Sequence, residues 1–306
     1  MLNKLKKSLK GEKKMLKFND DFNNTLGIEI ELISKVDREE LYSILESNGD
    51  SYTFTTRSYT HEVVSGWKVV TDSSLNISSS EERQGFKYGL EIVSPILNKE
   101  TFGQTQIILD LLQGDSRFKV NVNCAVHVHF GAKNLPLDVL KGAIKNYVKH
   151  ETAIKSTLPN SRRDRGYNQS MTIGMEVKDV RLQVQKLFGK INRANNHEAL
   201  ARTFRNHFQD VSLSSYFRQG TIEFRAHGGT LDFEKVNNWV VFLSNLFQAK
   251  NKLGNKSHSI TARFGKVWEE SKKHNFERTF FYLLNRNHEA LEWFKSRAES
   301  VNREVS

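Results

Sequence analysis

Acidic and imidazole side chains recur at every second position in four strand-like segments of this sequence. Successive strand residues point to opposite faces, so residues two apart share a face. In "VHVHFG" (126–131), His127 and His129 would share one face, and apolar residues would pack on the other. In "TIEFRAH" (221–227), the same alternation places Glu223, Arg225 and His227 on one face. If these segments are neighbours, one sheet face collects Glu29, Glu31, Glu91, His127, His129, Glu223 and Arg225.

Such a face predicts a site for divalent metal ions. Carboxylates a few ångströms apart raise one another's pKa, and a bound cation removes that repulsion. An oxygen-rich site favours Mg²⁺ or Mn²⁺, and the imidazoles shift the preference slightly towards Mn²⁺. Each pair alone has a simpler interpretation: Glu-x-Glu as a solvent face, Glu-x-Arg as an ion pair, and His-x-His as a polar face or a zinc or iron site. The conjunction on four strands favours the metal site.

The elements that must position these residues are strands separated by helices. β-branched and polar residues alternate in runs typical of strands at 26–34, 67–72, 88–94, 118–131 and 220–227. Asp37 followed by Glu40 marks the start of a helix that Gly49 ends, and a longer helix covers 137–158. Residues from about 234 onward are expected to be nearly all helical. The pattern predicts an α+β fold with a mostly antiparallel sheet backed by helices.

The composition is that of a soluble protein with a substantial core. The chain has 306 residues, of which 38% are hydrophobic. Its single cysteine, Cys124, excludes an intramolecular disulfide framework and is expected to be a buried structural thiol. No apolar run approaches the roughly 18 residues of a membrane span, and the N-terminus lacks secretory-signal features. We therefore expect a cytoplasmic protein without a membrane partner.

Much of the net charge of +11 lies at the N-terminus. Residues 1–18 hold seven lysines against Glu12. Such an arm is expected to be a solvated tail, although nucleic acid or another polyanion could bind it. The expected organisation is a basic arm at 1–18, a catalytic domain at 19–254 and a helical C-terminal extension of that domain at 255–306. The oligomeric state is left open.

Six motifs carry a resemblance to a known family. In chain order they are "GIEIE", "WKVVTDSS", "GLEIVSP", "VHVHFG", "SRRDRGY" and "TIEFRAHGGT". Over about residues 26–250 the chain resembles the amidoligases, carboxylate-amine ligases related to glutamine synthetase and glutamate-cysteine ligase. The resemblance implies a glutamine-synthetase-like fold, with a curved sheet whose concave face holds ATP and two or more Mg²⁺ or Mn²⁺ ions. It also implies amide formation through an acyl phosphate, on amino-acid or peptide substrates.

The resemblance assigns the metal ligands position by position. Glu29, His127 and Glu223 match the residues that hold the metal bridging the nucleotide's phosphates. Glu31 and Glu91 match ligands of a second metal, nearer the carboxylate substrate. The second metal's ligand shell would then be either incomplete or completed by substrate and water, because Glu91 is the one clear acid of its motif.

The other roles implied by the resemblance concern the substrates. His129 would lie beside the nucleotide, and Arg225 would contact the transferred phosphate. Asp72 of "TDSS" would orient or deprotonate the amine, with Ser73 standing where glycine is common in the family. The family has an arginine-tyrosine segment after the long helix, which would bind substrate carboxylate or phosphate. Its counterparts here are Arg162, Arg163 and Tyr167. A solvated helix end is the alternative interpretation of that segment.

Three other functions remain open from the sequence. A metal-dependent hydrolase or oxygenase would use the two histidines and a glutamate without ATP, with zinc or iron as its metal. A nucleic-acid-binding module would use the basic arm, and its binding would weaken with salt. A kinase-like relative would transfer phosphate without forming an amide.

Overall fold

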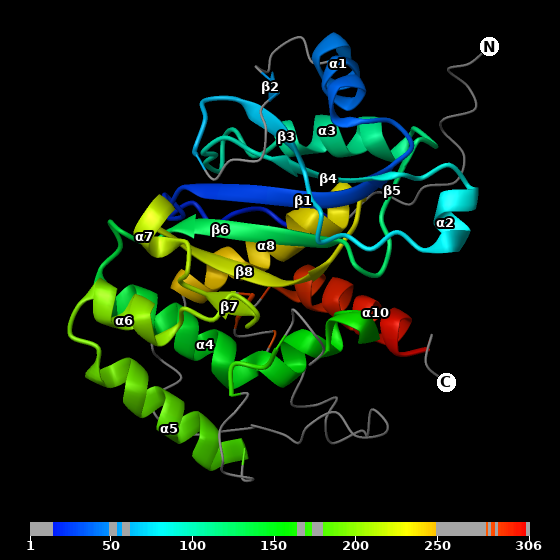
Figure 1. Cartoon of the computed structure of the whole chain (residues 1–306). Coiled ribbons are helices and arrows are strands. Elements are labelled where there is room, and N and C mark those ends of the chain that lie inside the picture. Colours follow the sequence, from blue (N-terminus) through cyan, green and yellow to red (C-terminus); the bar gives the residue numbers. More distant parts are fainter. Residues whose placement is uncertain are drawn as a thin grey trace.

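An eight-stranded, mostly antiparallel sheet lies at the centre of the fold (Figure 1). The strands run in the order β2-β3-β4-β1-β6-β8-β7, and β5 also pairs with β1. Only β2 and β3 pair in parallel among the described strands. The strand bounds are β1 Leu26–Ser34, β2 Phe54–Thr56, β3 Trp67–Thr71, β4 Tyr88–Val93, β5 Phe118–Lys119, β6 Ala125–Gly131, β7 Val211–Ser212 and β8 Thr221–Gly228. The computed structural model describes residues 15–48, 54–56, 62–163, 169–172, 180–248, 280, 283–284 and 287–303.

Helices pack against one face of this sheet and beyond its β7 edge. In Figure 1, α8 lies behind β1, β6 and β8, while α4, α5 and α6 lie below the β7 edge. The helix bounds are α1 Arg38–Asn48, α2 Ser79–Arg83, α3 Gln104–Gln113, α4 Leu137–Ser156, α5 Val180–Arg193, α6 His197–Thr203, α7 Tyr216–Gln219, α8 Phe233–Gln248 and α10 His288–Arg303, with a 3-10 turn η2 at Asn160–Arg162. The mixed α+β architecture and the mostly antiparallel sheet predicted from the sequence are confirmed.

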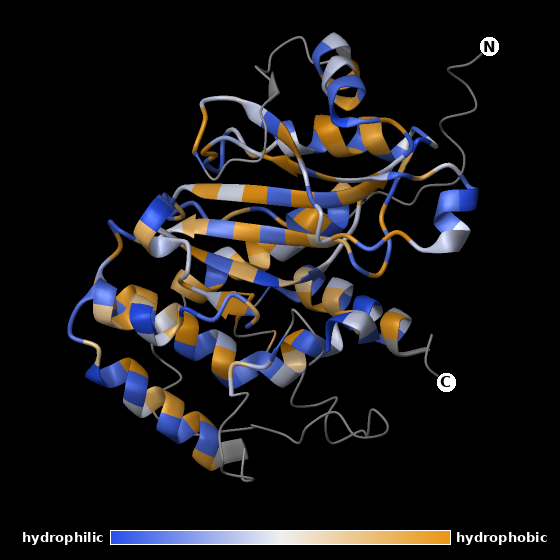
Figure 2. Ribbon diagram, in the orientation of Figure 1, coloured by the Kyte–Doolittle hydropathy of each residue, from blue (hydrophilic) through white to orange (hydrophobic). Residues whose placement is uncertain are grey.

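The period-two alternation divides the sheet into an apolar and a polar face. On β1, Ile28, Ile30 and Leu32 are buried in the main hydrophobic core, together with residues of α3, α4 and α8. On the neighbouring strands the rings of Phe130 and Phe224 meet edge to face, 5.9 Å between centroids. Figure 2 shows the alternation along β1 and β6. The helices therefore cover the apolar face and leave the polar face for chemistry.

One predicted strand is interrupted. The segment 118–131 is not continuous: β5 and β6 are separated by a turn. In that turn the Asn121 side-chain oxygen accepts the Asn123 N–H at 2.9 Å, and the Asn121 carbonyl accepts the Cys124 N–H at 3.2 Å. Asparagine readily forms turns of this kind, so the chain bends where the β-branched pattern suggests that it continues. The expected strands at 26–34, 67–72, 88–94 and 220–227 agree with β1, β3, β4 and β8 to within one residue at each end.

The predicted helix boundaries agree with the structure to within two residues where the structure describes them. The Asp37 carboxylate accepts the Glu40 N–H at 2.9 Å and so caps α1, whereas Gly49 lies outside the described residues. The long helix α4 ends at Ser156, two residues before the predicted end. Cys124 is free and buried, as expected.

Both ends of the described chain pack onto α8. Leu16 is buried, and its N–H donates to the Asn238 side chain at 2.8 Å, so the end of the predicted basic arm is not a solvated tail. Residues 1–14 lie outside the described part. At the other end, Phe294 of α10 contacts Phe242 of α8 at 5.3 Å between ring centroids, whereas 255–279 are not described. Within the described residues, no helix combines the length and apolarity needed to cross a membrane.

Candidate active site

Strand register brings the acidic and imidazole residues of four strands onto the polar face. Residues directly paired across neighbouring strands point to the same face. Glu29 of β1 pairs with His127 of β6, Glu31 pairs with Glu91 of β4, and His129 pairs with Glu223 of β8. The seven residues that the alternation predicts for one face therefore come from adjacent strands in the middle of the sheet.

Glu29 lies at the centre of two groups of potential metal ligands. The first consists of Glu29, Glu91 and His127, the second of Glu29, His129 and Glu223, and the ligand atoms within each group lie within 4.8 Å of one another. The Nδ1 atom of His127 is 3.1 Å from Glu29 Oε2, and His129 Nε2 is 3.2 Å from Glu29 Oε1. One carboxylate thus serves both groups, through a different oxygen for each histidine.

Glu29 and His129 stabilise each other's charged forms, and His127 also stabilises the charged form of Glu29. Burial would raise the pKa of Glu29, but His129 and His127 hold it well below its usual value. Burial would lower the pKa of His129, but the negative charges of Glu29 and Glu223 outweigh this effect and raise it. The cluster therefore combines an ionised carboxylate with an imidazole that readily takes up a proton.

Glu91 has the opposite electrostatic environment. Burial raises its pKa well above the usual value, and the charges of Glu29, Glu31 and Asp72 raise it further. The partial compensation by Arg225 does not reverse this effect. Without a bound cation, this end of the face favours a protonated carboxyl, as expected for crowded acids.

A β-bulge separates Arg225 from His227. The pairing of β6 with β8 shifts between Val126 and Val128. Arg225 remains on the polar face, where its guanidinium forms an ion pair with Glu223. His227 instead pairs with Val126 of the apolar face, and its ring packs on Trp239 of α8 at 5.3 Å. The predicted alignment of His227 with Glu223 and Arg225 is therefore wrong, because the bulge inserts a residue and reverses the alternation.

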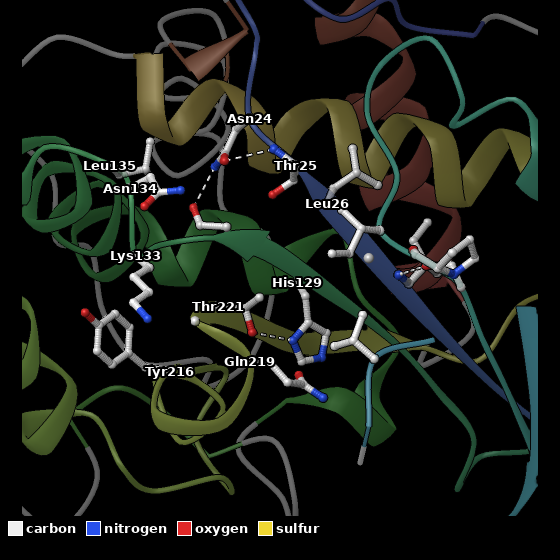
Figure 3. A pocket seen from close by; sticks show the side chains of 18 of the residues that line it. Asn24, Thr25, Leu26, His129, Lys133, Asn134, Leu135, Tyr216, Gln219 and Thr221 are labelled. Carbon is white, nitrogen blue, oxygen red and sulfur yellow. Dashed lines mark hydrogen bonds between the residues drawn. The ribbon is translucent and has the colours of Figure 1, made fainter. Parts of the chain in front are cut away.

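A pocket of about 730 Å³ adjoins the cluster at its Glu29 and His129 end. Its walls come from the segment 21–29, the ends of β4 and β6, and α7. His129 Nδ1 lies 3.0 Å from the Thr221 hydroxyl, which fixes the ring at the pocket wall (Figure 3). Figure 3 also shows Lys133 and Tyr216 on the wall formed by α7 and the segment after β6. The site thus joins a metal-binding type of cluster to a cavity of ligand size.

Comparison with known proteins identifies the family. The sequence matches the family described as "Putative amidoligase enzyme" over residues 23–247. The chain belongs to the amidoligase family. The resemblance predicted from the six motifs is thereby confirmed.

Similarity outside the family is weak. No curated protein matches the chain. Among solved structures, a bifunctional glutathione synthetase from Pasteurella multocida matches with 11% identity and a TM-score of 0.39, covering 91% of this chain and 48% of that one. The amidoligase chain thus spans about half the length of that enzyme, and the match carries no argument about function.

Glu31 has a position in the amidoligase site that its sequence motif does not reveal. Its Oε2 accepts the Ala125 N–H at 2.7 Å, and its Oε1 lies 3.6 Å from His127 Nε2. It belongs to neither group of three ligand atoms described above, whereas His129 belongs to one of them. The expected grouping, in which Glu31 and Glu91 share a metal and His129 attends the nucleotide, therefore stays a prediction.

The two arginines after α4 make different contacts. Arg162 is buried, and its guanidinium donates to the carbonyls of Asn123, at 3.1 Å, and of Cys124, at the Glu31 end of the site. Arg163 donates to the Leu158 and Ser156 carbonyls at 2.8 and 3.2 Å and so caps the end of α4. The role predicted for Tyr167 falls outside the described residues.

Asp72 follows β3 at the Glu91 side of the face. Its carboxylate accepts the Ser74 N–H at 2.8 Å, a turn that closes without glycine at Ser73. Its N–H donates to the Gly89 carbonyl at 2.9 Å, two residues before Glu91 on β4, and its negative charge contributes to the raised pKa of Glu91. Asp72 is therefore held in a defined loop at the edge of the cluster.

Several residues of the pocket wall were not predicted from the sequence. Lys68 of β3 is 4% exposed and lines the pocket. The alternation in β3 could have identified it: Trp67 and Val69 are buried on one face, so Lys68 between them points to the opposite face of the sheet. Val63, Ile96 and Phe217 line the pocket as exposed apolar residues, and they come from loops and a short helix that give no periodic signal.

Proposed function

We propose that this amidoligase is an ATP-dependent carboxylate-amine ligase that activates its acid as an acyl phosphate and acts on amino-acid or peptide substrates. The observation that supports it most directly is the double role of Glu29 and His129. Both contribute to a group of potential metal ligands, and both line the adjoining pocket. A metal-nucleotide complex requires such an arrangement, because its phosphates must meet the metal ligands while its base occupies a cavity.

The residues of the polar face fit divalent metal ions. Carboxylates combined with imidazole suit Mg²⁺ or Mn²⁺. His129 Nε2 is buried and makes no hydrogen bond within the described residues, although Glu29 lies close to it. Glu29, Glu91, His127, His129 and Glu223 would hold the ions. Bound there, they would neutralise phosphate charge and orient the reacting phosphate.

The pocket has the polarity of a nucleotide site. Its lining includes the polar residues Glu29, His129 and Lys68, and also apolar residues that are exposed to solvent. Val63, Ile96 and Phe217 are 54%, 65% and 48% exposed, respectively. Exposed apolar groups around a cavity favour an apolar or aromatic ligand surface, such as a base. A nucleotide would therefore place its base among the apolar residues and its phosphates at the cluster.

The chain's own residues suit each part of amide formation. Arg225, beside Glu223, would contact the phosphate that passes to the carboxylate and stabilise its charge. That transfer releases ADP and gives the acyl phosphate, from which the amine displaces inorganic phosphate. Asp72 lies near Glu91 and would accept the amine's proton, because only the neutral amine attacks. Arg162, buried near Glu31, would face the acid substrate.

The proposal includes a glutamine-synthetase-like arrangement of the sheet. The mostly antiparallel strands place the acids and histidines on the face that α8 does not cover. In this arrangement the nucleotide enters from the Glu29 end, and the acid and amine enter from the end with Glu31, Asp72 and Arg162.

Thermal unfolding with ATP and metal tests the proposal without knowledge of the acid or amine. We expect the melting temperature to rise only when ATP and Mg²⁺ or Mn²⁺ are present together, because binding to the native state stabilises it by mass action. Ligand at 100 times its dissociation constant contributes about 2.7 kcal/mol. The rise should disappear in Glu223→Gln and persist in Glu82→Gln, which alters an exposed acid on α2.

Other outcomes would redirect the assignment. No shift with ATP, but a strong shift with zinc or iron alone, would favour a hydrolase or oxygenase. A shift of equal size in Glu223→Gln would contradict the proposed position of the metal-nucleotide complex.

A further inference from the structure

Lys68 lies in the same transverse row of the sheet as Glu29 and His127. In register, Lys68 of β3 pairs with Val93 of β4, which also pairs with Glu29 of β1, and Glu29 pairs with His127 of β6. Residues paired across strands share a face, so the row sets Lys68 on the polar face, two strands from Glu29. It is therefore the cation of β3 that faces the site.

The side chain of Lys68 is buried at the pocket rather than exposed on the surface. It is 4% exposed and lines the same pocket as Glu29 and His129. Its Nζ donates to the Glu62 carbonyl at 2.8 Å, which fixes the ammonium beside the segment leading into β3. Lysines are rarely buried to this extent, because removing the ammonium from water is costly. An anionic ligand in the pocket would compensate part of that cost.

We propose that Lys68 binds the phosphate chain of the nucleotide, a role that rests on the proposed function above. Lysine acts as a compact point charge towards phosphate oxygens. The other described lysine of the pocket, Lys133, is exposed on the wall formed by the segment after β6 and α7. Lys68 is instead buried in the row that contains Glu29. It thus recognises phosphates and contributes nothing to recognition of the base.

Binding of ADP, ATP and adenosine to variants of Lys68 tests this role. Dissociation constants are measured calorimetrically for the full chain, at a fixed concentration of Mg²⁺ and again at a fixed concentration of Mn²⁺. In Lys68→Met, we expect binding of ATP and ADP to weaken about tenfold or more, the size expected for a lost charged hydrogen bond. Adenosine should bind as to the wild type, and Lys68→Arg should retain most of the ATP affinity. Lys133→Met is the matched control and should lose less.

Each other outcome has a defined meaning. If Lys68→Met binds ATP normally while Glu223→Gln does not, the role of Lys68 is wrong and the proposed function stands. If Lys68→Met loses adenosine and ATP equally, Lys68 shapes the pocket and the phosphate role is wrong. If the wild type binds no ATP with either metal, both proposals fall. If thermal melting without ligand shows that Lys68→Met does not fold, Lys68→Gln is used in its place. Normal ATP binding by folded Lys68→Gln would then contradict the phosphate role of Lys68.

Discussion

Glu29 is the residue on which the chemistry of the site converges. Its two oxygens face different histidines, His127 at 3.1 Å and His129 at 3.2 Å, and it also lines the pocket. A buried carboxylate would normally tend towards the protonated form, but the two imidazoles keep its pKa low. The two histidines therefore have different positions around Glu29. His127 pairs directly with Glu29 across the strands, whereas His129 pairs with Glu223 and lines the pocket.

Cys124 provides a test of burial at the Glu31 end of the site. Burial raises the pKa of its thiol to about 12. The thiolate is the reactive form, so at pH 8 about one thiol in ten thousand would be ionised. We expect iodoacetamide to leave Cys124 unmodified in the native protein and to alkylate it once in denaturant, as measured by mass spectrometry. Rapid native labelling would contradict the buried position.

Residue types and spacing were sufficient to predict which side chains share the polar face. The alternation in β1 and β6 placed Glu29, His127 and His129 correctly, because these strands are regular where they pair. It failed for His227, because a bulge depends on the partner strand and is invisible in the segment itself. Lys68 was not selected, because a single lysine among apolar strand residues has no partner within its own motif.

At the scale of elements, the turn after β3 sets the position of Asp72 against β4. The Asp72 N–H donates to the Gly89 carbonyl at 2.9 Å. A Cβ atom at Gly89 would lie 2.5 Å from the Asp72 carbonyl oxygen and 2.9 Å from the Leu75 Cβ. The close approach requires glycine here, one residue after the start of β4 and two before Glu91.

Gly89→Ala should therefore destabilise the protein by about 1 to 3 kcal/mol, the usual cost of overpacking. The matched control is Gly103→Ala at the start of α3, where a Cβ atom meets nothing within 4 Å. We expect the control to stay within about 1 kcal/mol of the wild type. Urea unfolding of the three proteins measures the difference, and equal loss in both variants would contradict the close packing of the turn on β4.

Elements were predictable where one face is buried, and less so where side chains define a turn. The strands β1, β3, β4 and β8 each bury a row of apolar residues, which produces the alternation used to predict them. The turn at Asn121, by contrast, depends on hydrogen bonds of a single side chain. The three-residue β2 and two-residue β7 are too short to produce a pattern, and pairing with β3 and β8 alone defines them.

At the scale of the whole molecule, α8 connects the ends of the chain to the sheet. Leu16 near the N-terminus bonds to Asn238, and Trp293 of α10 donates to Glu234 at 2.6 Å. The apolar face of the sheet packs on the same helix. Because the polar face carries several like charges, this shared core must supply the stability that the site does not. The stability of the molecule therefore depends strongly on keeping its core neutral.

Two core histidines make that stability sensitive to acid. Burial, followed by the charge of Lys149, lowers the pKa of His150 on α4 to about 3, and burial lowers that of His227 to about 3 as well. An unfolded histidine has a pKa of about 6.5, so between these values the unfolded chain binds more protons. This contribution to the free energy of unfolding is complete above pH 6.5 and decreases as the pH falls.

Each of these histidines should lower the free energy of unfolding by about 1.4 kcal/mol per pH unit below about pH 6. Replacing His150 by leucine removes one such contribution, because leucine has no proton to bind. Urea unfolding of wild type and His150→Leu at pH 7, 6 and 5, with chelator to exclude metal, measures the slopes. The variant should lose less stability on acidification, whereas His207→Leu, at an exposed position, should follow the wild type. Identical slopes for His150→Leu and wild type would mean that His150 can take up a proton in the native state, contrary to its burial on α4.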